Sequence, residues 1–349
     1  MLALQPPSAL RSLSLSAPFE LLARFVPDVG HLTGLTQLEL QAGSFPDAEL
    51  DDNDWNEDGA DLDQCLLQHL PHSLESLKLA RFHSVHLKPP AAPDRAAQLS
   101  AHGAQAAASL SRLPPAITRL EIAGSGHVGL AAPLPSLAQL AISRCFFFKV
   151  SGEGLSLPQL TSLQLAGRMA GVHLHCGAMP ALAQLESSSI HLAAEDSFAA
   201  LRQVTRMRLV VARTFLRSTA ELLAGVSASL RSLTIRASLA DMGLAAKAAQ
   251  VLAAAGTAQL TYLEFSGSVC LEFLPSWPSL QVLALDGVRP TSVTISEMEA
   301  LAAAPSLRRL ELACSLASEG GAMALRQEAE CMLEMERRLP GCTVAEYDF

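Results

Sequence analysis

Residues 280–285 read Leu-Gln-Val-Leu-Ala-Leu, and residues 307–312 read Leu-Arg-Arg-Leu-Glu-Leu. Both stretches carry an apolar residue at the first, fourth and sixth positions, and this six-residue pattern recurs along the whole chain. Self-similarity at a spacing of roughly 20 to 30 residues indicates a repeat architecture. The twelve copies begin at Leu10, Leu35, Leu74, Ile117, Leu137, Leu160, Leu182, Val204, Leu230, Leu260, Leu280 and Leu307.

Each copy predicts one short parallel strand. The fourth and sixth residues alternate with period two, so they should point into a core while the third and fifth point to solvent. Proline precedes the first apolar residue by two positions in several copies, at Pro135, Pro158, Pro180, Pro278 and Pro305. Such punctuation excludes a bundle of alanine- and leucine-rich helices. One copy cannot bury its leucines alone, so neighbouring copies must stack.

The pattern resembles the leucine-rich-repeat family, and the resemblance covers nearly the whole chain. It implies an α/β fold: a leucine-rich-repeat solenoid, or horseshoe, similar to the ribonuclease-inhibitor-like class. About 12 to 13 repeats would form a parallel concave sheet roughly 55 Å long, with a mixed helical and irregular convex side. The family's ninth position usually holds Asn or Cys, whereas here only Cys145 fits. We therefore expect an irregular array whose turns are satisfied by serine, water or backbone groups.

The predicted organisation is a single domain, residues 1–349. Two inserts lengthen the spacing between copies, an acidic loop at about 47–66 and an Ala/Pro/Ser-rich segment at about 88–115. Serine and glutamate at capping-box spacing, Ser296 and Glu299, predict the start of one helix. Helices are predicted over 214–225, 240–255, 296–304 and 321–339, and a last strand over 342–344.

Composition excludes several classes of protein. Half of the 349 residues are apolar and 17% are charged, which argues against global disorder. The net charge of −9 argues against a nucleic-acid-binding domain. No apolar run is long enough to span a bilayer, so we expect no membrane partner. Seven cysteines without a CxxC motif fit a reducing compartment, so we expect an intracellular, cytoplasmic protein.

Motifs for catalysis and cofactor binding are missing from the sequence. There is no nucleophile elbow, P-loop, dinucleotide fingerprint or HExxH motif, so we expect no enzymatic activity and no cofactor. Asp54 to Gly59 matches the first half of a calcium-binding EF-hand loop, but position twelve is Cys65 instead of a glutamate. Histidines follow several strands, at His83, His86, His127, His173, His175 and His191, without completing a tetrahedral set. We therefore expect the histidines to lie on the surface at the rim of the array and the acidic loop to be solvated, and we expect no metal site.

The sharpest charge feature is basic. Residues 202–236 hold seven arginines and one acid, and Arg206 and Arg208 occupy outward positions of one predicted strand. A solvated arginine-rich surface that reflects codon usage is the alternative reading of this segment. Outward parity and charge predict a partner-binding set on the concave sheet, in which the aromatic residue is a plausible interface anchor. Its members are Arg206, Arg208, Arg236, Tyr262, Glu264, Arg309 and Glu311.

The family resemblance implies a non-catalytic scaffold that recognises another protein on its concave sheet. The basic positions favour a partner with an acidic segment, and we expect a monomer. One alternative is the substrate-recognition subunit of an SCF-type ubiquitin ligase, although nine residues before Leu10 leave no room for an F-box. A ciliary or cytoskeletal scaffold and the regulatory domain of a larger enzyme are the others. Nucleic acid is disfavoured because aromatic residues for base stacking are scarce.

Overall fold

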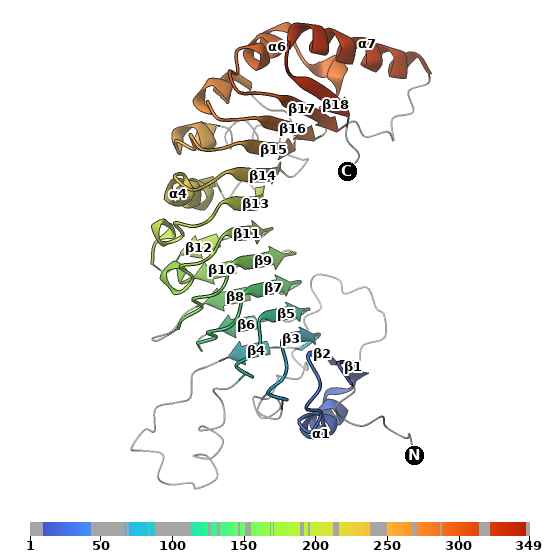
Figure 1. The fold of residues 1–349 in the computed structure, drawn as a ribbon, viewed down its shortest axis with the longest axis vertical. Helices are drawn as coiled ribbons and strands as arrows, with labels where there is room; N and C mark the ends of the chain where they lie inside the picture. Colours follow the sequence, from blue (N-terminus) through green and yellow to red (C-terminus); the bar gives the residue numbers. More distant parts are fainter. Residues whose placement is uncertain are drawn as a thin grey trace. The chain divides into compact units, whose positions relative to one another are not determined.

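The protein is an α/β structure in which the sequence repeat forms parallel strands (Figure 1). The computed structural model describes residues 10–42, 67, 70–82, 84–87, 113–124, 127–130, 133–145, 147–150, 155–167, 169, 171–188, 192–194, 196–211, 216–237, 250–266, 271–286, 288–313 and 322–346. The chain divides into two compact units, each described by itself below. Unit 1 is Met1–Leu182 with His191–Ser197, and unit 2 is Ala183–Ile190 with Phe198–Phe349.

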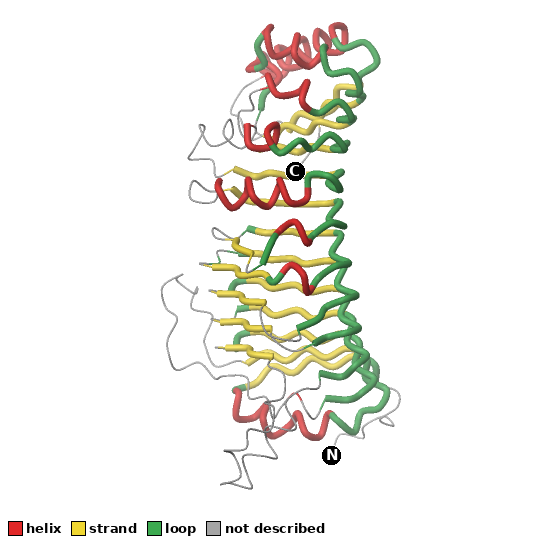
Figure 2. Tube along the Cα trace, turned by 90° about the vertical axis from the view of Figure 1, so that its left-hand side faces the viewer, coloured by secondary structure: helices red, strands yellow, loops and turns green. Residues whose placement is uncertain are grey.

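Every copy of the pattern contributes a strand, as the sequence predicts, and the strands of each unit appear in yellow in Figure 2. Unit 1 contains β1 (Ser12–Ala17), β2 (Gln37–Ala42), β3 (Ser76–Ala80), β5 (Arg119–Ala123), β7 (Gln139–Ser143) and β9 (Ser162–Ala166). Unit 2 contains β11 (Gln184–Ser187), β13 (Arg206–Val211), β14 (Ser232–Ala237), β15 (Tyr262–Ser266), β16 (Val282–Asp286), β17 (Arg309–Ala313) and β18 (Thr343–Glu346). The last of these is the predicted closing strand.

Neighbouring strands align copy against copy. In unit 2, Leu233 of β14 pairs in register with Leu263 of β15, which pairs with Leu283 of β16. In most copies the fourth and sixth residues are almost fully buried, as at Leu263 and Phe265, while the third and fifth stay partly exposed. Ala284, the fifth residue of its copy, is an exception and is fully buried. The burial pattern confirms the predicted alternation in most copies, and it means that each layer of core side chains is shared between successive copies.

A regular hydrogen-bond pattern marks the start of each strand. The N–H groups of Arg231 and Ser232 both donate to the carbonyl of Thr205, the equivalent position one copy earlier. A threonine hydroxyl often adds a third bond to this type of carbonyl, and asparagine is absent from these positions. The donors are Thr36, Thr118, Thr161, Thr205 and Thr261. Threonine at strand starts therefore supplies side-chain hydrogen bonds that the sequence analysis did not predict.

The strands of unit 1 end in a left-handed turn that the sequence did not reveal. Arg81, Gly124, Arg144 and Gly167, each eighth in its copy, have positive φ angles of 61°, 65°, 53° and 101°. Their stacking is close, because a Cβ atom added to Gly167 would lie 3.0 Å from the backbone nitrogen of Arg144. The turn reverses the chain after the strand, so a glycine suits the tightest of these positions.

A second parallel sheet, which the sequence analysis did not predict, follows these turns in unit 1. Its strands are β4 (Ser84–Leu87), β6 (His127–Leu130), β8 (Phe147–Val150), β10 (Gly171–Leu174) and β12 (Leu192–Ala194). Val128, Phe148, Val172 and Leu192 form one fully buried row across it. The core of unit 1 thus receives apolar side chains from two sheets.

The helices agree in part with the sequence predictions. Helix α4 (Leu216–Val226), α6 (Ile295–Ala302) and α7 (Ala322–Arg338) lie where helices were expected, and residues 250–254 form the described part of another. Helix α1 (Phe19–Val29) was not predicted. Short 3₁₀ helices η2 (Cys176–Ala178), η3 (Phe198–Ala200), η5 (Leu271–Ser276) and η6 (Pro290–Ser292) complete the list. None of the described helices is long and apolar enough to cross a membrane.

The predicted capping box of α6 is wrong by two residues. Thr294, and not Ser296, is the N-cap: its hydroxyl accepts from the N–H of Glu297 at 3.3 Å. The Glu297 carboxylate accepts from the N–H of Thr294 at 2.7 Å, which closes the box. Two overlapping Ser/Thr-x-x-Glu motifs compete here, and the extended backbone of Thr294 decides in favour of the first.

Candidate functional site

The predicted contact residues all lie on one face of the unit 2 sheet. We call this the outward face of unit 2: it comprises the third, fifth and seventh residues of each copy, which alternate with the buried ones. The strand registers align Arg206, Ser232, Tyr262, Val282 and Arg309 in one row. A second row aligns Glu186, Arg208, Thr234, Glu264, Ala284 and Glu311. Arg236 belongs to a third row, where it aligns with Ser266 and Asp286.

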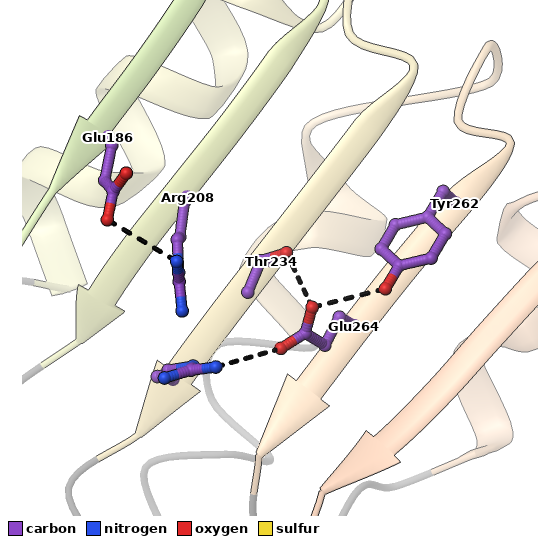
Figure 3. Close-up of polar contacts among 6 residues, drawn as sticks. Glu186, Arg208, Thr234, Tyr262 and Glu264 are labelled. Atoms are coloured by element: carbon purple, nitrogen blue, oxygen red, sulfur yellow. Dashed lines mark hydrogen bonds and ion pairs between the residues drawn. The ribbon is translucent and has the colours of Figure 1, made fainter. Parts of the chain in front are cut away.

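Glu264 is the centre of a polar network (Figure 3). Its Oε2 accepts hydrogen bonds from the hydroxyls of Thr234 at 3.0 Å and Tyr262 at 3.2 Å. Its Oε1 lies 3.6 Å from a guanidinium nitrogen of Arg236. The side chain is only 12% exposed, so these partners replace the water that the carboxylate would otherwise bind. The network fixes four side chains from two adjacent strands.

Tyr262 is held in its neutral form. Burial raises the pKa of its phenol to about 12, and the Glu264 and Glu311 carboxylates add to this rise against the opposing effect of Arg309. The hydroxyl therefore acts as a donor to Glu264 throughout the physiological pH range. This arrangement presents the aromatic ring at a fixed position on the outward face.

Asp286 is a neighbour of this network that the sequence analysis missed. Burial raises the pKa of its carboxyl above the ordinary value; the Arg236 guanidinium opposes the rise and the Glu264 carboxylate adds to it. Asp286 is the seventh residue of its copy, one position beyond the six-residue pattern. The sequence did contain a signal for it: Asp286 directly follows the inward-facing Leu285, so strand alternation places Asp286 on the outward face.

The other end of the outward face holds a second tight pair. Arg309 Nε lies 2.7 Å from Glu311 Oε1, and the Glu311 side chain is 13% exposed. Ala284, which lies between Glu264 and Glu311 in the same row, is fully buried. Three successive positions of this row are therefore largely withdrawn from solvent.

Arginines on β13 are arranged differently. Arg208 Nη1 lies 3.6 Å from Glu186 Oε1, and the two side chains are 41% and 36% exposed (Figure 3). Arg206 is exposed, and no carboxylate of the described residues lies within ion-pair distance of it. An exposed pair of this kind contributes little to stability and exchanges readily with solvent or a ligand.

The predicted basic segment does not form one continuous patch. Of its seven arginines, Arg206, Arg208 and Arg236 reach the outward face, and the last two face carboxylates. Arg202 and Arg231 lie in the turns before β13 and β14, while Arg217 belongs to helix α4. Arg213 lies outside the described residues. The positive character of the face is therefore concentrated at β13.

Unit 1 carries a smaller polar set on the corresponding strand positions. Lys78 Nζ lies 3.1 Å from Glu39 and 3.6 Å from Glu121, the residues that flank it in register. The hydrogen bond to Glu39 and the charges of both carboxylates raise the pKa of Lys78. The other outward residues of unit 1 are mostly serine, glutamine and alanine, and Arg119 is exposed.

The residues that the sequence analysis considered for metal binding either lie outside the described residues or do not form a metal site among them. The acidic loop at 47–66, with Asp54 to Gly59, and nearly all of the 88–115 insert lie outside the described residues, as do His83 and His191. His86, His127 and His173 fall on strands of the second sheet. Among the described residues, no group of three or more His, Cys, Asp or Glu side chains could hold a metal ion.

A buried cysteine and an aspartate meet at η2. The Asp196 carboxylate accepts from the N–H groups of Cys176 at 2.7 Å and Gly177 at 2.6 Å, and His175 Nδ1 lies 3.9 Å from it. Burial and the neighbouring Asp196 raise the pKa of the Cys176 thiol to about 12. This thiol is therefore protonated at neutral pH and unsuited to act as a nucleophile; the cluster caps a 3₁₀ helix.

No model of a known protein family matches the chain, and no curated protein matches it.

Proposed function

We propose that this chain is a leucine-rich-repeat solenoid that binds a partner protein on the outward face of unit 2, and that it acts as a non-catalytic scaffold. The fixed network around Glu264 is the observation that carries the proposal. It holds an aromatic ring and an arginine at set positions on the outward face, and both residue types are favoured at interface hot spots.

Two further features support the repeat assignment and the binding role. Successive copies pair in register over several strands, and their strand starts share one hydrogen-bond pattern. A sheet built in this way is rigid, so binding costs little ordering entropy. We also propose that the protein acts in the cytoplasm as a monomer that binds without a cofactor.

The test is capture of partners from native lysate on the immobilised protein. The variant Arg206→Glu with Arg208→Glu reverses two charges on β13. Arg326→Glu with Arg337→Glu makes the same change in net charge on helix α7, where both side chains are highly exposed. We expect a stoichiometric protein that the wild type and the α7 variant retain and the β13 variant loses. An identical set of captured proteins in all three samples would contradict the proposal.

A further inference from the structure

We propose that the segment recognised by unit 2 is an extended acidic peptide that lies along β13 and takes the place of Glu186 as the partner of Arg208. This inference rests on the proposed function and deepens it. It names the chemistry of the ligand and identifies a residue of this chain that competes with the ligand.

Two parts of the outward face of unit 2 differ in how many of their charged groups already have partners, and therefore in how readily they can bind a ligand. On β15 and β17, Glu264 and Glu311 are nearly buried and already bonded by Tyr262, Thr234 or an arginine. On β13, Arg206 has no carboxylate partner among the described residues, and Arg208 has only a long, solvent-exposed one. New charge-assisted hydrogen bonds can therefore form at β13 with least loss of existing bonds.

Spacing on β13 selects the form of the ligand. Arg206 and Arg208 are two residues apart on one parallel strand, so their side chains leave the same face about 6.6 Å apart. Alternate residues of an extended peptide have the same period. Two carboxylates separated by one residue can thus meet both guanidinium groups at once, whereas two adjacent carboxylates point to opposite sides, so only one of them can reach the arginines.

Neighbouring strands favour a ligand that runs along β13 instead of across the sheet. Ser232 and Thr234 of β14 are uncharged, and Arg236 on the same strand already faces Glu264 of β15, where the row of carboxylates begins. Asp286 follows on β16. An acidic segment that crossed toward these strands would approach like charges, while one confined to β13 stays about two strand spacings from the first of them.

Glu186 acts as an internal competitor in this arrangement. It occupies the position opposite Arg208 on the adjacent strand, at 3.6 Å, and both groups are well solvated. A ligand carboxylate that binds Arg208 must displace Glu186 from it. The displaced Glu186 carboxylate stays nearby and repels the ligand. Glu186 therefore lowers the affinity of the site for all acidic ligands. Ligands that also bind Arg206 compensate for this loss and are selected over the others.

The test measures binding of two labelled peptides by fluorescence anisotropy. Each carries two glutamates among serines: in the alternating peptide one serine separates the two glutamates, and in the other peptide they are adjacent. We expect Glu186→Gln to tighten the alternating peptide about two- to fivefold, the factor of an exposed ion pair. The gain should vanish in Arg208→Gln with Glu186→Gln, and added salt should weaken binding. Glu330→Gln is the matched control, because it frees Arg326 from a similar exposed pair on α7.

Two results would overturn the inference. One is an affinity that Glu186→Gln leaves unchanged, or that Glu330→Gln raises equally. The other is equal binding, or equal lack of binding, of the two peptides. Neither result removes the proposed function, which fails separately if partner capture from lysate does not depend on Arg206 and Arg208.

Discussion

The phenol of Tyr262 donates a hydrogen bond to Glu264 across 3.2 Å, and these two residues are the first and third residues of strand β15. Side chains two apart on a strand point to the same side, so the contact forms without any change of backbone. The carboxylate also reaches Thr234 and Arg236 on the preceding strand. One residue thereby ties two copies of the repeat together on the outward face of unit 2.

Glu264→Ala is expected to destabilise unit 2. The substitution leaves the Thr234 and Tyr262 hydroxyls without their acceptor and removes the carboxylate that faces Arg236, which should cost about 1–3 kcal/mol of unfolding free energy. Urea denaturation measures the loss. Glu186→Ala, which removes an exposed carboxylate from the same row, should cost less than about 0.5 kcal/mol. Equal losses for the two variants would show that the network adds no stability.

Tyr262 should titrate late. The chain has two tyrosines, and burial together with the Glu264 and Glu311 carboxylates raises the pKa of Tyr262 to about 12. A raised phenol pKa favours the folded state below the ordinary value near 10, and this contribution is lost as the pH rises through the folded value. Ultraviolet titration of tyrosinate should show a late step that Tyr262→Phe removes. A late step that survives in Tyr262→Phe would assign it to the other tyrosine.

Asp196 is expected to stabilise the η2 turn of unit 1. Burial raises the pKa of its carboxyl, but hydrogen bonds from the Gly177 and Cys176 N–H groups more than offset this, and the pKa lies below its ordinary value. Its contribution is therefore present above the unfolded value near 3.9 and lost as the pH falls through the folded pKa.

Two variants measure this contribution. Asp196→Ala should cost about 1 kcal/mol near neutral pH, as for the loss of a helix cap, and Asp196→Asn should cost less because it keeps an acceptor. Thermal or urea unfolding at neutral and acidic pH gives the comparison with the wild type. The difference between wild type and Asp196→Ala should shrink in acid; a difference independent of pH would contradict a role for the ionised carboxylate.

Gly171→Ala should strain the second sheet. A Cβ at this position would lie 2.8 Å from Cε2 of Phe147, whose ring also packs against His173 at a centroid distance of 5.2 Å. We expect a loss of about 1–3 kcal/mol, typical of overpacking. In a Phe147→Ala background the same substitution should cost much less. Additive losses in the double variant would show that the ring is not the obstacle.

The long strands could be predicted because each copy repeats a pattern that buries two leucines in register. The second sheet could not, because its four-residue strands alternate too briefly, as in Gly171 to Leu174, and contain glycine and histidine. Helix α1 was missed because Pro27 lies inside it and no side chain caps its start. The buried Leu22, Val26 and Val29, at helical spacing, were the signal for it.

Outward placement of the site residues followed from strand parity, and the structure agrees with it for Arg206, Arg208, Tyr262 and Glu264. Their pairing did not follow, because it depends on side-chain reach across strands. Arg236 meets Glu264 diagonally, because it lies two residues beyond Thr234, the register partner of Glu264 on the neighbouring strand. Asp286 joins from β16, on the other side of Glu264. A count of arginines in the sequence therefore overstated the free positive charge of this face.

Site-specific photocrosslinking tests most directly whether the outward face of unit 2 binds a partner. A photoreactive residue at Ser232, in the row between Arg206 and Tyr262, samples that face, and one at Arg326 on α7 is the control. We predict a crosslinked partner from Ser232 that Arg206→Glu with Arg208→Glu abolishes, and none from Arg326. The same partner crosslinked from Arg326 alone, or from Ser232 regardless of the charge reversal, would contradict the account.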